Sequence, residues 1–213
     1  MNEKYVYIIF SSTPFKLGKL IRKVTNYKFN HVSVCIDAEE TTVYSFARHF
    51  KDFPFYGGFV KESSARYIHN DECAYVKLCA IPVTDDQHVK LKRFVAEMEK
   101  HPDKYIYNHF SAVGSLFHKK VKIKNAYTCV EFVTTLLNEC DVMPEIDIRK
   151  YYPMKDLEKS LNQYVVYEGS FKEMSFYLND QEDTFYQAAD PYTGIFLTFY
   201  TNMRLFYTFL RNF

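Results

Sequence analysis

Apolar and polar residues alternate with two different periods along the chain, and this divides it into strands and helices. A period of two predicts strands over residues 4–11, 31–37, 41–48, 72–81 and 164–168. A period near that of the α-helix predicts helices over residues 14–24, 85–100, 105–117 and 129–140, with a short one from Pro153. The aromatic stretch around Gly57-Gly58 is expected to be an irregular loop.

The carboxy-terminal residues 192–213 differ from the rest of the chain in how their polar and aromatic residues are distributed. Their polar residues fall in one narrow stripe of a helical projection: Thr198, Thr201, Asn202, Arg204, Thr208 and Arg211. The remaining broad face carries six aromatic residues: Phe196, Phe199, Tyr200, Phe206, Tyr207 and Phe209. This face predicts packing on the domain, a homodimer interface or an interfacial membrane helix.

The composition sets the limits on function. A chain of 213 residues fits one domain with an elaboration. The 27 basic and 26 acidic side chains give a net charge of +1, and the basic runs lack interleaved aromatic residues, so no nucleic-acid partner is expected. The 20 Phe and 19 Tyr, without Trp, favour a β-rich or mixed fold.

Targeting and cysteine patterns suggest a location. The amino terminus lacks the features of a secretory signal, and no run of 18 uncharged apolar residues is present. The five cysteines are odd in number and form no CxxC pair, which favours reduced thiols. We therefore expect a cytoplasmic protein, and no ligand cluster of suitable spacing predicts a metal or an organic cofactor.

Two residues are the best candidates for chemistry. Cys129 stands at the expected start of a helix, where the helix dipole and unpaired N–H groups favour a thiolate and stabilise an oxyanion. His31 is the best placed of the seven histidines to act as a base, because it stands at the head of a strand. The alternative is a structural strand histidine and a buried helix-start cysteine.

Four short motifs resemble a known family in their order and spacing: NHVSV at 30–34, VYSFAR at 43–48, YTCVEFV at 127–133 and PMKDL at 153–157. The chain is similar to the circularly permuted papain-like cysteine hydrolases of the NlpC superfamily, in particular the YiiX/YebB-like amidase group; lecithin-retinol acyltransferases are more distant relatives. The resemblance covers residues 5–168 and includes the pair Tyr107-Asn108. It implies that Cys129 is the nucleophile and that His31, 98 residues earlier, is the general base.

The third catalytic position departs from the family pattern. Where the family places an acid or a second histidine to orient the base, the matching residue here is Ser45, and Val130 replaces a serine after the cysteine. A serine accepts a hydrogen bond but does not stabilise an imidazolium as a carboxylate does. Three consequences stay open: a slower enzyme, orientation by Glu62 or a backbone carbonyl, or lost catalysis. We expect Glu131 to cap the helix rather than take part in chemistry.

Together these features predict an α+β fold, with a small antiparallel sheet, curved or barrel-like, packed on the helix that bears Cys129. Residues 1–169 would form the permuted papain-like domain, and residues 170–213 an aromatic-rich extension packing on it. The expected function is a cysteine amidase or peptidase that forms an acyl-enzyme on a peptide, amide or lipid-ester substrate. The alternatives are a non-catalytic binding module on the same fold, a lipid-directed acyltransferase or thioesterase, and a peripheral membrane protein that binds through residues 192–213.

Overall fold

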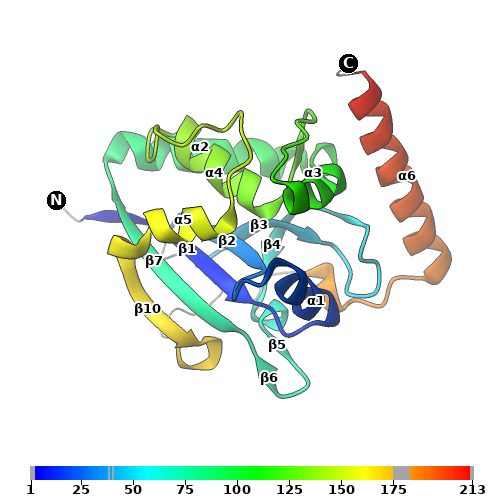
Figure 1. Ribbon diagram of the computed structural model, residues 1–213, viewed down its shortest axis with the longest axis horizontal. Helices are drawn as coiled ribbons and strands as arrows, with labels where there is room; N and C mark the ends of the chain where they lie inside the picture. The colour runs from blue at the N-terminus through cyan, green and yellow to red at the C-terminus, as the bar shows by residue number, and fades with distance from the viewer. Residues whose placement is uncertain (1–2, 38, 40, 175–182, 212–213) are drawn as a thin grey trace.

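One large sheet organises the computed structural model, which describes residues 3–37, 39, 41–174 and 183–211 (Figure 1). The strands follow the order β10-β7-β1-β2-β3-β4-β8-β9. Their bounds are β1 (Lys4–Ser12), β2 (His31–Cys35), β3 (Val43–Arg48), β4 (Gly57–Glu62), β7 (Tyr75–Val83), β8 (Ile106–Tyr107), β9 (Ala126–Tyr127) and β10 (Val165–Ser170). A separate small hairpin pairs β5 (Ile68–His69) with β6 (Glu72–Cys73).

Six α-helices accompany the sheet within the described residues, and the predicted α+β class is therefore confirmed. They are α1 (Lys16–Thr25), α2 (Asp85–Lys100), α3 (His109–Gly114), α4 (Cys129–Glu139), α5 (Met154–Ser160) and α6 (Pro191–Leu210). Short 3₁₀ helices connect them: η1 (Ser64–Arg66), η2 (Pro102–Lys104), η3 (Ser115–Phe117), η4 (Asn162–Tyr164), η5 (Phe171–Glu173) and η6 (Thr184–Tyr186). The helix expected over residues 105–117 is shorter than predicted, because its first residues pair in β8.

The sheet is open and mixed, not a closed barrel or a purely antiparallel sheet. All neighbouring strands are antiparallel except β8 and β9, in which Tyr107 lies opposite Tyr127. Each of these last two strands of the sheet has only two residues, too few to continue the sheet toward closure. Their pairing has a local consequence: it brings Tyr107 beside the segment that leads directly into Cys129.

The two faces of the sheet bury separate clusters. On one face, α2, α4 and α5 cover the strands, as Figure 1 shows, and α4 contributes Phe132, Val133, Leu136 and Leu137 to the larger core. The packing of the Cys129-bearing helix on the sheet thus agrees with the sequence expectation. The other face holds a smaller cluster that includes Ile9, Val43, Tyr67 and Phe171.

Strand β4 lies where the sequence suggested a loop. Its six residues pair along β3, with Ser45 opposite Val60 and Val43 opposite Glu62. The two glycines that look like loop residues instead allow close backbone approach: a Cβ on Gly57 would meet the carbonyl oxygen of Ala47 at 2.6 Å, and one on Gly58 that of Tyr105 at 2.4 Å. This strand ends at Glu62, which matters for the site.

The expected extension, residues 170–213, is described except for residues 175–182 and 212–213. Asp183 binds Arg66 through a doubly hydrogen-bonded ion pair of 2.7 Å, and Phe185 is buried nearby. Helix α6 then lies along the edge of the molecule beside α3 (Figure 1). Across the described ranges, none of the helices combines the length and apolar character needed to cross a membrane.

Candidate active site

Cys129 is the first residue of α4. Thr128 caps this helix: its hydroxyl accepts a hydrogen bond from the N–H of Glu131, whose carboxylate in turn accepts from the N–H of Thr128. Ser111 also donates to Glu131, so this carboxylate has the capping role expected from the sequence. This reciprocal pair of hydrogen bonds, a capping box, fixes the first turn of α4. The N–H groups of Cys129 and Val130 have no carbonyl acceptor within the helix.

His31 is the first residue of β2, and the residue before it is held firmly. Asn30 accepts hydrogen bonds from the N–H of Thr13 (2.9 Å) and from the guanidinium of Arg22 (2.5 Å), and its amide donates to the Thr13 hydroxyl (2.8 Å). The His31 backbone is further fixed opposite Ser11 of β1. The imidazole therefore projects from a rigid position, as a catalytic base requires.

The imidazole of His31 lies against the carboxylate of Glu62. Their Nε2 and Oε1 atoms are 2.5 Å apart, with the His31 side chain 13% exposed and that of Glu62 fully buried. Burial by itself would lower the pKa of His31, but Glu62 and then Cys129 outweigh it and raise this pKa to about 10. Burial would likewise raise the pKa of Glu62, yet His31 and Arg66 lower it to about 2. The pair is thus an imidazolium and a carboxylate at neutral pH.

Two hydroxyl groups complete the surroundings of Glu62. Ser45 donates to its Oε1 atom and Tyr67 to its Oε2 atom. The Tyr67 hydroxyl is also 3.0 Å from that of Ser33. Burial and the neighbouring Glu62 raise the pKa of Tyr67 well above its ordinary value, so it stays a donor. A buried carboxylate with three donors is held in one position.

The thiol of Cys129 is the second partner of the imidazole. Cys129 interacts with the imidazole and contributes, after Glu62, to the raised pKa of His31. His31 therefore connects Cys129, from the start of α4, with Glu62, from the end of β4. Cys129 itself is 6% exposed.

Tyr107 stands beside this pair. Burial, followed by the charges of Cys129 and Glu131, raises the pKa of Tyr107, which keeps its phenol protonated at neutral pH. A protonated phenol on the strand that pairs beside the start of α4 is a potential donor to an oxyanion. Its position follows from the β8–β9 pairing.

The structure brings together Cys129, His31 and Ser45, the three residues singled out from the sequence. Their contacts differ from those expected. Cys129 and Glu62 both act on His31, whereas Ser45 donates to Glu62 and not to the imidazole. Glu62, the alternative to Ser45, is therefore the residue that contacts the imidazole of His31. The sequence favours Ser45 because it stands where the family places its acid. Residues Phe59 to Glu62 do not alternate between apolar and polar side chains, so no local pattern reveals β4 or points to its last residue.

Sequence reasoning missed Tyr67, Arg66 and Ser11. The first two lie shortly after Glu62, and no local pattern distinguishes them from ordinary polar residues. Ser11 lies opposite His31 in the sheet, and its hydroxyl is buried without a hydrogen-bond partner in the described structure. Residues opposite each other in antiparallel strands point to the same face, so Ser11 shares the side of the sheet that carries His31.

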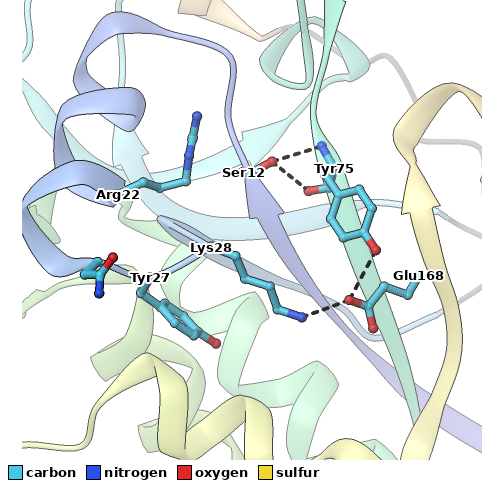
Figure 2. A pocket seen from close by; sticks show the side chains of 7 residues that line it. Ser12, Arg22, Tyr27, Lys28, Tyr75 and Glu168 are labelled. Atoms are coloured by element: carbon cyan, nitrogen blue, oxygen red, sulfur yellow. Dashed lines mark hydrogen bonds and ion pairs between the residues drawn. The ribbon is translucent and has the colours of Figure 1, made fainter.

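A surface pocket of about 560 Å³ lies near the start of β2 and is lined by none of Cys129, His31 and Glu62 (Figure 2). Its charges are largely paired internally. Lys28 lies 2.9 Å from Glu168, which also contacts the Tyr75 hydroxyl, and Arg22 binds the carbonyl oxygen of Thr13. We therefore assign these residues to support of the fold around Asn30 rather than to ligand binding.

Comparisons with protein-family models, with curated proteins and with solved structures found no match for this chain. The family resemblance therefore remains an expectation drawn from the sequence motifs.

Proposed function

We propose that this protein is a cysteine hydrolase, an amidase or peptidase, that acts through Cys129, His31 and Glu62. The observation that carries the proposal is the position of His31, which touches a buried carboxylate on one side and a helix-start thiol on the other. A base that lies between a nucleophile and an acid that orients the base is the general pattern of thiol-dependent acyl transfer. The order of His31 before Cys129 in the chain supports a permuted papain-like arrangement.

The reaction follows from the charges at the site. An imidazolium stabilises the thiolate of Cys129, whose sulfur attacks the carbonyl carbon of an amide or ester. The negative oxygen formed in this step faces the N–H groups at the start of α4, with Tyr107 as a further donor. The imidazolium then gives its proton to the departing amine or alcohol, which leaves a thioester on Cys129.

The second half of the reaction releases the acyl group. The now neutral His31 takes a proton from water, and the resulting hydroxide attacks the thioester carbonyl. Collapse of this intermediate breaks the carbon–sulfur bond, releases the carboxylic acid and returns the thiolate beside the imidazolium that formed when His31 took the proton. Glu62 stabilises the imidazolium at each stage, while Ser45 and Tyr67 hold Glu62 in place.

A reducing compartment suits this chemistry, and we place the protein in the cytoplasm. All five cysteines are free thiols. A nucleophilic cysteine must stay reduced to act, and reducing conditions keep it so.

Acylation by p-nitrophenyl acetate tests the proposal, because this activated ester needs no specific recognition. Wild-type protein should release p-nitrophenol and carry an acetyl group on the Cys129 peptide by mass spectrometry. Cys129→Ala should lose both signals. Cys140→Ala is the matched control, since Cys140 is a buried cysteine at the opposite end of the same helix. Equal rates in wild type and Cys129→Ala would favour a non-catalytic binding module on this fold.

A further inference from the structure

Helix α6 exposes an extended apolar face. Nine of its large apolar side chains are between 45% and 85% exposed, among them Tyr192, Ile195, Phe196, Phe199, Met203 and Leu210. The helix has 20 residues, which makes it about 30 Å long. An exposed patch of this size and character marks an interaction surface rather than ordinary surface composition.

The opposite side of α6 is firmly attached to the domain. Leu205 is buried with Ile106, Ile123 and Ala126, and Phe110 stacks on Phe209. Asn202 donates to the carbonyl oxygen of Phe55, and Arg204 to that of Asp103. The helix therefore presents its apolar face from a fixed position, and Figure 1 shows no other element on its outer side.

Cations border this apolar face. A recess of about 340 Å³ beside the carboxy-terminal half of α6 is lined by Lys104, Lys124 and Arg204, and none of these three pairs with a carboxylate in the described part of the chain. Arg211 lies one turn past Tyr207 at the end of α6, with its guanidinium 5.4 Å from that ring. Residues 191–213 contain no Asp or Glu.

From this combination we infer that α6 docks the protein on an anionic membrane surface. The Phe, Ile, Met and Leu side chains enter the boundary between headgroups and acyl chains, where Tyr rings are also favoured. Lys104, Lys124, Arg204 and Arg211 meet the lipid phosphates. Charge favours a bilayer over a second copy of the chain, because a symmetric interface would gather these cations without acidic partners on α6.

Vesicle flotation of the full chain tests the inference. Wild type should float with phosphatidylserine-containing vesicles at about 0.15 M salt and much less with pure phosphatidylcholine vesicles. Phe199→Glu should weaken this binding about tenfold or more, as should Lys104→Glu combined with Lys124→Glu. The matched controls are Val89→Glu on α2, an equally exposed apolar position, and Lys155→Glu with Lys159→Glu on α5; both should bind like wild type.

Circular dichroism of each variant separates a folding defect from a binding defect, so that only folded variants are compared. Absence of flotation of wild type with anionic vesicles would overturn the inference. Equal weakening by Phe199→Glu and Val89→Glu would overturn it too, as would a wild-type dimer by sedimentation that Phe199→Glu dissociates. Cys129→Ala should float like wild type, so this test is independent of the proposed chemistry.

Discussion

The Nε2 atom of His31 lies 2.5 Å from the Oε1 atom of Glu62, although 30 residues and two strand connections separate them in the chain. This contact replaces the one expected between His31 and Ser45. It also makes the pair sensitive to pH, because each residue raises or lowers the pKa of the other in favour of the charged form.

The pH dependence of stability should show this ion pair. The pKa of His31 is raised from 6.5 to about 10, so its contribution is complete below 6.5 and is lost as the pH rises toward 10. The pKa of Glu62 is lowered from 4.5 to about 2, so its contribution is complete above 4.5 and is lost as the pH falls toward 2. The pair therefore stabilises the protein most between these two limits.

Glu62→Gln should remove the alkaline part of this dependence. Urea unfolding from about pH 6 to pH 9 should give a free-energy difference between wild type and variant that shrinks as the pH rises. Other titrating groups contribute to both proteins and cancel in the difference. A difference that stays constant over this range would show that His31 is not charged by Glu62.

Ser45 and Ser11 form a matched pair of buried serines near His31. Ser45→Ala removes a donor from a buried carboxylate and should lower the free energy of unfolding by about 1.5–3 kcal/mol. Ser11→Ala removes a hydroxyl without a partner in the described structure and should be neutral or stabilising. Chemical denaturation of both variants measures the difference; equal losses would contradict the hydrogen-bond assignment around Glu62.

Two capping boxes within the described residues allow the same kind of comparison. Thr84 and Gln87 cap α2 as Thr128 and Glu131 cap α4. Thr84→Ala and Thr128→Ala should each cost about 0.5–2 kcal/mol of stability. Only Thr128→Ala should also slow alkylation of Cys129, because it loosens the turn that carries the thiol. A similar effect of both variants on alkylation would indicate general destabilisation.

Hydrogen bonds of Asp183 connect the carboxy-terminal segment with the turn that follows Glu62. It accepts hydrogen bonds from Arg66 and from both the N–H and the hydroxyl of Ser63, and it is buried with Arg66. Asp183→Ala leaves the buried guanidinium without its partner and should lower the free energy of unfolding by about 3–5 kcal/mol. Asp147→Ala, which breaks an exposed ion pair with Arg149, is the control and should change little.

Local signals predicted the parts of the fold that depend on local interactions. The helix start at Cys129 and the capping box at Thr84 are both visible in the sequence because their partners lie within three residues. The strand start at His31 follows from simple alternation. The α+β class follows from the same periodicities.

The remaining features depend on contacts between distant segments. The glycines of β4 serve the close approach of neighbouring backbones, which no single-strand pattern encodes. The contact of Glu62 with His31 likewise joins residues of different strands, so the sequence leaves Glu62 only as an alternative to Ser45. The Arg66–Asp183 ion pair joins residues 117 positions apart, and the two-residue strands β8 and β9 are too short to leave a periodic signal.

The rate of iodoacetamide labelling at Cys129 as a function of pH tests the central claim most directly. It should be followed by mass spectrometry in wild type, His31→Asn and Glu62→Gln, with buried Cys140 as the internal reference; burial and then Glu139 raise the pKa of Cys140 to about 11. The account predicts fast labelling of Cys129 already near about pH 6, lost in both variants. A rate that rises about tenfold per pH unit up to the ordinary thiol value of about 8.5, and is the same in all three proteins, would contradict an activated Cys129–His31–Glu62 site.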